Sequence, residues 1–164
     1  MNNTVAKTQN FMRAATVDIV LLAVACLVPT LSHAFALPLY QLNPMLLVLL
    51  ASMLLVSDRR NAFLMAVLLP VVSMVTVGMP TPMKALCMVP EMLTIVAVSS
   101  LTLGKVSGYF GRMGCMVVAI LCGKAVYYAL KAVLIGGALV TTPWLMQALV
   151  VVLAAGLFAA FCKK

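Results

Sequence analysis

NAFLMAVLLPVVSMVTVGMPTPMKALCMVPEM, residues 61–92, contains the features that decide the fold of this chain. Residues 61–83 carry no charged side chain, and an apolar run of about 20 residues can cross a bilayer as a helix. Proline fixes φ and has no backbone N–H, so Pro80 and Pro82 should end one helix and begin the next. The stretch therefore predicts two membrane helices joined by a short turn.

The composition extends this prediction to the whole chain. The 164 residues are 65% hydrophobic and 9% charged, with a mean hydropathy of +1.20, whereas soluble domains carry about 25% charged residues. The apolar runs are continuous and not alternating, which excludes a strand barrel. We therefore predict an all-α integral membrane protein with a single membrane domain, residues 1–164, in contact with membrane lipid.

Reading apolar runs between charges and turn residues predicts a six-transmembrane-helix bundle. The predicted helices cover approximately residues 14–32, 37–56, 61–77, 83–104, 113–138 and 143–162. An alternative stays open for the first one. Basic residues before the apolar segment 19–28, followed by Ser32-His33-Ala34, also fit a cleavable signal peptide, although we expect an uncleaved helix.

The net charge of +8 does not indicate a nucleic-acid partner, because the basic residues flank apolar segments. Loops enriched in Lys and Arg remain in the cytoplasm. With both termini inside, the loops at 57–60 and 105–112 and the tail Lys163-Lys164 all become cytoplasmic. We therefore expect a multi-pass protein of a bacterial or archaeal cytoplasmic membrane.

Catalytic and metal-binding motifs are lacking in this sequence. It has no phosphate-binding loop, no usable Ser/His/Asp set and three acids on separate segments, so we expect that it is not an enzyme. A single histidine, His33, and five dispersed cysteines predict neither a metal site nor a cofactor.

Charged residues inside predicted spans are the strongest pointer to a site, because each costs about 2.5–3.5 kcal/mol at the bilayer centre. Glu91 lies nine residues after Pro82, and Lys131 lies eight residues before Leu139, so antiparallel helices place both at similar depth. We expect them to face each other. A purely structural ion pair and a pair that receives a polar ligand are both compatible with this spacing.

A polar and aromatic face supports the ligand interpretation. Lys124, Tyr127, Tyr128 and Lys131 fall on one side of the fifth predicted helix. Asn43, Trp144 and Gln147 lie near predicted outer loops and are candidates for the rim of the same site. The alternatives are structural tyrosines, and a tryptophan that anchors the chain at the interface.

Two other intramembrane charges have simpler interpretations. Lys84 is close enough to the outer interface to extend to it. Asp18 can reach the inner interface, where Arg13 or Arg112 could neutralise it. Pro90 deletes one hydrogen bond inside the fourth helix and should kink it beside Glu91, which favours a polar cavity there.

Three stretches of the sequence carry a family resemblance, over about half of the chain. They are Asn43-Pro44, Asp58-Arg59-Arg60-Asn61-Ala62, and the series Leu69-Pro70-Val71-Val72-Ser73, Gly78-Met79-Pro80 and Pro90-Glu91-Met92-Leu93. With six short helices, the chain resembles the substrate-binding S-components of energy-coupling-factor (ECF) vitamin importers.

The resemblance implies a capture subunit that binds a water-soluble vitamin or related metabolite from outside, possessing no ATPase activity of its own. Its partners would be a transmembrane coupling subunit and two cytoplasmic ATPases. By position, the resemblance implies a gating loop of Gly78, Met79, Pro80, Thr81 and Pro82. It also implies substrate contacts from Glu91, Lys124, Tyr127, Tyr128, Lys131 and Trp144.

The chain departs from the family in its first helix. Small residues four apart, in an AxxxA pattern, often meet the coupling subunit in relatives, but Ala14, Ala15, Ala23 and Ala25 form no such pair. The alternative function is a non-transporting six-helix scaffold that resembles the rod-shape-determining membrane protein of cell-wall elongation. An intramembrane enzyme ranks last.

Overall fold

The computed structural model describes residues 2–35, 43–56, 58–135 and 144–162, and these form six α-helices and no strand. The α-helices are α1 (Asn2–Ala34), α2 (Pro44–Leu55), α3 (Arg59–Val77), α4 (Pro82–Thr102), α5 (Tyr109–Leu134) and α6 (Trp144–Phe161). A short 3₁₀ helix, η2 (Leu103–Lys105), extends α4. The predicted all-helical architecture is therefore confirmed for the described residues.

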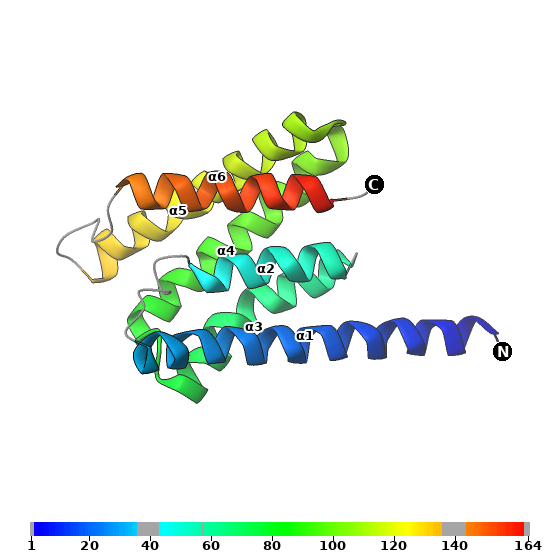
Figure 1. Ribbon diagram of the computed structural model, residues 1–164, viewed down its shortest axis with the longest axis horizontal. Helices are drawn as coiled ribbons and strands as arrows, with labels where there is room; N and C mark the ends of the chain where they lie inside the picture. The colour runs from blue at the N-terminus through cyan, green and yellow to red at the C-terminus, as the bar shows by residue number, and fades with distance from the viewer. Residues whose placement is uncertain (1, 36–42, 57, 136–143, 163–164) are drawn as a thin grey trace.

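The helices run alternately up and down along the long axis of the molecule (Figure 1). We call the end that holds the α3–α4 turn, residues 78–81, the proline end. We call the opposite end, which holds Arg13 and the α2–α3 turn, the arginine end. The first residues of α1 and the last residues of α6 lie at the arginine end (Figure 1), so both termini are on the same side of the bundle.

Four helices have segments that are long and apolar enough to cross a membrane: Phe11–Ser32, Arg59–Val77, Pro82–Lys105 and Tyr109–Leu134. The apolar helices Pro44–Leu55 and Leu145–Phe161 are shorter. Of the six predicted spans, four are therefore confirmed as helices long enough to cross a membrane, and the other two are shorter apolar helices. Large apolar side chains also cover the outer surface, where Leu145 is 86% exposed and Val75 is 74% exposed. Lipid tails suit such a surface far better than water.

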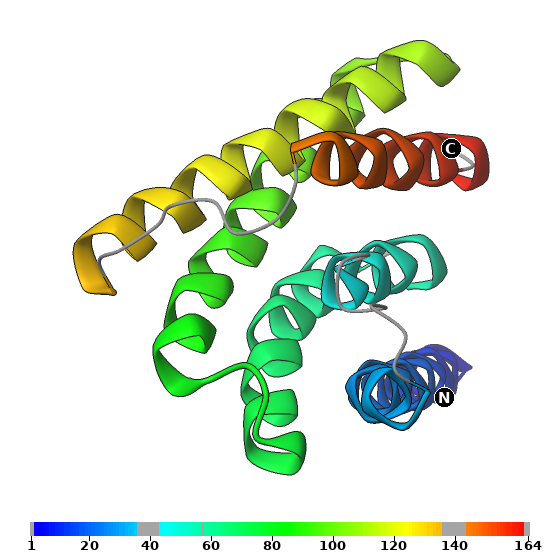
Figure 2. The same cartoon turned by 60° about the vertical axis from the view of Figure 1, so that its left-hand side comes forward.

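The interior consists of two apolar clusters that share α2 and α4. One cluster joins α1, α2, α3 and α4, with Leu49, Met65 and Leu69 fully buried. The other joins α2, α4, α5 and α6 around Ile95 and Ile120. In agreement with this, α4 packs against α3 on one side and α5 on the other (Figure 2).

The α3–α4 turn forms as its sequence predicts. Gly78 ends α3 at φ 72, a left-handed conformation that glycine adopts without steric cost, and its N–H bonds Met74 O at 3.1 Å. Pro82 is the first residue of α4, where its missing N–H is harmless. The peptide bond between Met79 and Pro80 is cis. Both α3 and α4 continue through an internal proline, Pro70 and Pro90 respectively.

Four predicted boundaries are wrong. The second helix begins at Pro44 and not near residue 37, and the fifth ends at Leu134 and not near residue 138. The first helix begins at Asn2 and not near residue 14, because the polar residues before the apolar run continue the same helix. The fifth helix begins at Tyr109 and not near residue 113. Gly108, at φ 89, has a non-helical conformation, and α5 starts at the residue after it. Arg112 lies inside that first turn and donates to Cys162 O at the end of α6, where a cation interacts favourably with the helix dipole.

Candidate functional site

Glu91 is the buried charge of α4. It follows Pro90 directly and is only 3% exposed. Its Oε1 atom lies 2.6 Å from Lys124 Nζ of α5, and the Lys124 side chain is 23% exposed. The pair therefore joins two neighbouring helices by a charge-assisted contact, with the lysine on the more open side.

The predicted partner of Glu91 was Lys131, and the structure corrects this. The depth estimate assumed that the fifth helix continued to residue 138, whereas α5 is described to Leu134 and Ile135 follows as its C-cap. Lys131 therefore lies in the last turn of α5. Lys124 is seven residues earlier, about 10 Å deeper along the helix, which is the level of Glu91.

Aromatic side chains continue the site from Lys124 toward α6. Lys124 Nζ lies 5.5 Å from the centroid of the Tyr127 ring, within the range of a cation–π interaction. Tyr127 and Tyr128 meet edge to face at 5.4 Å between centroids. The Tyr128 hydroxyl donates to Gln147 Oε1 of α6 at 2.8 Å.

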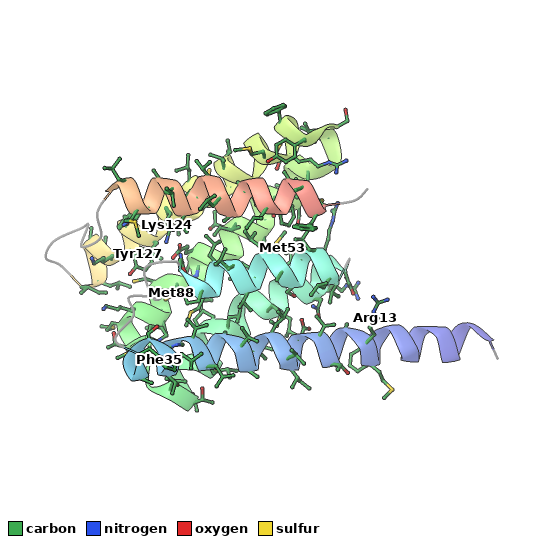
Figure 3. The ribbon with its side chains drawn as sticks, viewed as in Figure 1. Arg13, Phe35, Met53, Met88, Lys124 and Tyr127 are labelled. Carbon is green, nitrogen blue, oxygen red and sulfur yellow. The ribbon has the colours of Figure 1, made fainter. Side chains whose placement is uncertain are left out.

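These contacts form one continuous group, Glu91–Lys124–Tyr127–Tyr128–Gln147, which we call the α4–α6 network. It contains five of the eight predicted substrate-binding residues and joins three helices. Figure 3 shows Lys124 and Tyr127 in the half of the bundle nearer the proline end, far from Arg13. These contacts bring polar side chains of the fourth and fifth helices together, with Lys124 and not Lys131 beside Glu91, and that they bind a substrate stays a prediction.

Close helix packing beside the ion pair depends on a residue that the sequence analysis did not single out. A Cβ atom placed on Gly123 would lie 2.9 Å from Glu91 O and 2.5 Å from Ile95 Cγ1. Only glycine lets α4 and α5 approach this closely. In the sequence, the only indication of this role is that Gly123 directly precedes Lys124. A single glycine in a predicted helix is weak evidence for close packing.

The other predicted site residues lie apart from this network or outside the described part. Asn43 is the N-cap of α2 at φ 49, and its side chain makes no capping bond, while its carbonyl accepts from Leu46 N at 3.0 Å. Trp144 begins α6, but its side chain lies outside the described residues. Among the predicted gating residues, Gly78, Met79, Thr81 and Pro82 are exposed and Pro80 is half-buried.

A second polar cluster lies near the arginine end, around Asp18. Asp18, which is 7% exposed, accepts hydrogen bonds from Ser52 Oγ at 3.2 Å and from Asn61 Nδ2 at 3.0 Å. The sequence had suggested Arg13 or Arg112 as a neutralising partner for Asp18, and Arg112 donates to Cys162 O at the end of α6 instead. Ser52 had no reason to stand out in the sequence, because a lone serine in an apolar run is ordinary.

The polar groups of the α4–α6 network indicate what kind of ligand the site could bind. The α4–α6 network offers an ammonium, two phenols, an amide and a carboxylate, which suit recognition of a polar or aromatic small molecule. Within the described residues, no group of three or more His, Cys, Asp and Glu side chains is arranged to hold a metal ion.

Comparison of the chain with models of protein families, with curated proteins and with solved structures gave no match.

Proposed function

We propose that this protein is the substrate-capture subunit of an ECF-type importer, which binds a water-soluble vitamin or related metabolite from the outer side of a cytoplasmic membrane. The observation that carries the proposal is the α4–α6 network. Ionisable groups buried among membrane helices are energetically costly. Where they occur, they commonly mark the path of a substrate or an ion. The coupling subunit and the two ATPases are the partners that the proposal needs.

The network suits a ligand with a carboxylate or an aromatic ring. The ammonium group of Lys124 has three N–H donors, and the contact with Glu91 uses one direction only. A ligand carboxylate can share the same ammonium, and a planar ring can stack on Tyr127 or Tyr128, which are half-buried. Lys131 at the end of α5 adds positive charge between this network and the proline end.

The charge distribution supports the orientation in the proposal. Arg13, Arg59, Arg60, Lys105 and Arg112 all belong to the arginine end or its turns. By the positive-inside rule, this end faces the cytoplasm and the proline end faces outward. The α4–α6 network then lies nearer the outer surface, as a capture site requires.

The decisive experiment is mass spectrometry of small molecules released from protein purified after overproduction. We expect a stoichiometric polar metabolite, whose dissociation constant is then measured with the intrinsic fluorescence of Trp144, the single tryptophan of the chain. Lys124→Gln should weaken binding about tenfold or more, since a charge-assisted contact is worth about 1.5–3 kcal/mol. Neutralising Glu91 or Lys131 should also weaken binding.

Lys84→Gln is the matched control, because Lys84 is an exposed lysine of α4 outside the network. Tyr127→Leu is a second test variant if the lysine variant unfolds, since it removes the ring on which a ligand would stack and leaves the contact between Lys124 and Glu91 in place. Equal affinities for Lys84→Gln, Lys124→Gln and Tyr127→Leu would refute the assignment of the site.

A non-transporting scaffold is the second candidate function, and one observation favours it. Glu91 and Lys124 contact each other directly, and every buried side-chain nitrogen and oxygen of the described residues has a hydrogen-bond partner. A scaffold needs no ligand to satisfy such a network. It would release no small molecule in the mass spectrometer, and cross-linking in membranes would capture protein neighbours along its lateral faces.

A further inference from the structure

A cleft of about 840 Å³ opens at the arginine end, between α1 and the α2–α3 turn. It lies at the opposite end of the bundle from Lys124 and Tyr127, and Arg13 at its margin is visible in Figure 3. Its volume falls within the range of small-molecule and headgroup sites, about 300–1,000 Å³. The cleft is therefore separate from the α4–α6 network, and its ligand is a separate question.

The cleft lies at the level where two candidate spans begin. These spans start at Phe11 in α1 and at Arg59 in α3, and the cleft is lined by residues from the first turns of both. Residues at the start of a span lie among the phospholipid headgroups. The molecules that meet this cleft most often are consequently headgroups of the surrounding leaflet.

Two arginines and two carboxylates line the cleft, so their formal charges cancel: Arg13, Asp18, Asp58 and Arg60. Asp18 is fixed in place by hydrogen bonds from Ser52 and Asn61, and it is 7% exposed. Asp58 is fixed by accepting the backbone N–H of Arg60 at 3.0 Å. Both acceptors are thus held in place beside two exposed arginines.

The remaining lining is apolar and continues onto the lipid-facing surface. Phe11 is 74% exposed, Leu55 is 58% exposed and Leu64 is 55% exposed, and all three line the cleft. A small polar ligand that fills the cleft leaves these outward side chains uncovered. A molecule with acyl chains covers them while its headgroup fills the cleft.

We propose that this cleft binds the headgroup of a zwitterionic phospholipid with a primary ammonium, of the phosphatidylethanolamine class. Arg13 and Arg60 hold the phosphate, since guanidinium groups match phosphate geometry. Asp18 and Asp58 accept hydrogen bonds from the ammonium. A purely anionic headgroup would meet two carboxylates, and a quaternary ammonium prefers an aromatic cage, whereas Phe11 is the single aromatic residue of the lining.

The test uses the full chain in nanodiscs that contain equal amounts of phosphatidylethanolamine, phosphatidylglycerol and phosphatidylcholine with identical acyl chains. Native mass spectrometry then measures which lipids remain bound to the protein after it is released from the nanodiscs. We expect phosphatidylethanolamine to be retained at least about fivefold over each of the others, or about 1 kcal/mol, because its ammonium alone donates hydrogen bonds to Asp18 and Asp58. Retention proportional to the lipid mixture would overturn the proposal.

Arg60→Gln and Arg59→Gln form a matched pair, because both arginines are exposed neighbours in the first turn of α3 and only Arg60 lines the cleft. Arg60→Gln should lower the retention of all three lipids, since each carries the phosphate, and Arg59→Gln should leave retention unchanged. Asp58→Asn keeps a residue that caps helices well and should reduce the preference over phosphatidylglycerol. Equal losses in the two arginine variants would show a non-specific charge effect and overturn the site.

Soluble phosphoethanolamine distinguishes a lipid from a free phosphate ester as the source of the headgroup. At millimolar concentration it should fail to displace the bound lipid, because it cannot cover Phe11, Leu55 and Leu64. Complete displacement, or tight binding of phosphoethanolamine to detergent-purified protein, would overturn the assignment to a lipid. The result does not depend on whether the α4–α6 network captures a substrate.

Discussion

At the α4–α6 network Glu91 is held by a lysine, whereas near the arginine end Asp18 is held by a hydroxyl and an amide. Both carboxylates are more than nine-tenths buried in apolar helices. In the first arrangement two opposite charges compensate each other, so removal of one leaves the other without a countercharge. The second stabilises a carboxylate with neutral donors beside an open cleft. The two sites should therefore respond differently when one partner is changed.

The largest effect is expected from Lys124→Met, which leaves Glu91 buried without its cation. Breaking a buried pair by removing one partner costs about 3–5 kcal/mol, and because Lys124 is 23% exposed we expect about 3 kcal/mol here. Chemical unfolding in detergent measures the change. The double variant Glu91→Gln with Lys124→Met should recover most of the lost free energy of unfolding. If the loss in the double variant equals the sum of the losses in the two single variants, the two residues are not coupled.

The contact between α4 and α5 is tested next by Gly123→Ala. The new Cβ atom would lie 2.9 Å from Glu91 O, so the helices must separate, and overpacking of this kind costs about 1–3 kcal/mol. Gly114→Ala is the matched control in the same helix, because a Cβ there has no atom within 4 Å. It should be neutral or stabilise α5 by up to about 1 kcal/mol. A similar cost for both variants would show that helix propensity and not contact with α4 determines the result.

The two sites also differ in how far the sequence could predict them. Charged residues such as Glu91 stand out in apolar runs, and a helical face placed Lys124, Tyr127 and Tyr128 together correctly. The choice between Lys124 and Lys131 depended on where α5 ends, and a helix end in an apolar run has no clear signal. A shift of a few residues was enough to select the wrong lysine.

Neutral partners are harder to predict than charged ones. Asp18 was recognisable, but Ser52 and Asn61 lie on α2 and α3, and their contact with α1 depends on how three helices pack. The helix order itself followed from prolines, glycines and charges, because these residues act locally on the backbone. The cleft at the arginine end arises only from packing, so no stretch of sequence indicates it.

A smaller effect is expected from Asp18→Asn. Asparagine retains an acceptor for Ser52 and Asn61 and removes the cost of a buried charge, so the free energy of unfolding should change by about 1 kcal/mol or less. The same substitution type at the other site, Glu91→Gln, removes the countercharge of Lys124 and should cost clearly more. Unfolding curves measured side by side check the difference. Equal losses would mean that Asp18 depends on a cation after all.

The smallest effect is expected at the end of the α4–α6 network, from Tyr128→Phe. The variant keeps the ring contact with Tyr127 and removes only the hydrogen bond from Tyr128 to Gln147. Hydrogen bonds between membrane helices are worth about 0.6 kcal/mol on average, so stability should fall by about that amount. Tyr127→Phe is the natural comparison, because the described residues give the Tyr127 hydroxyl no hydrogen bond. If Tyr128→Phe costs no more than Tyr127→Phe, α6 is held to α5 by apolar packing alone, and Gln147 is free to serve a ligand.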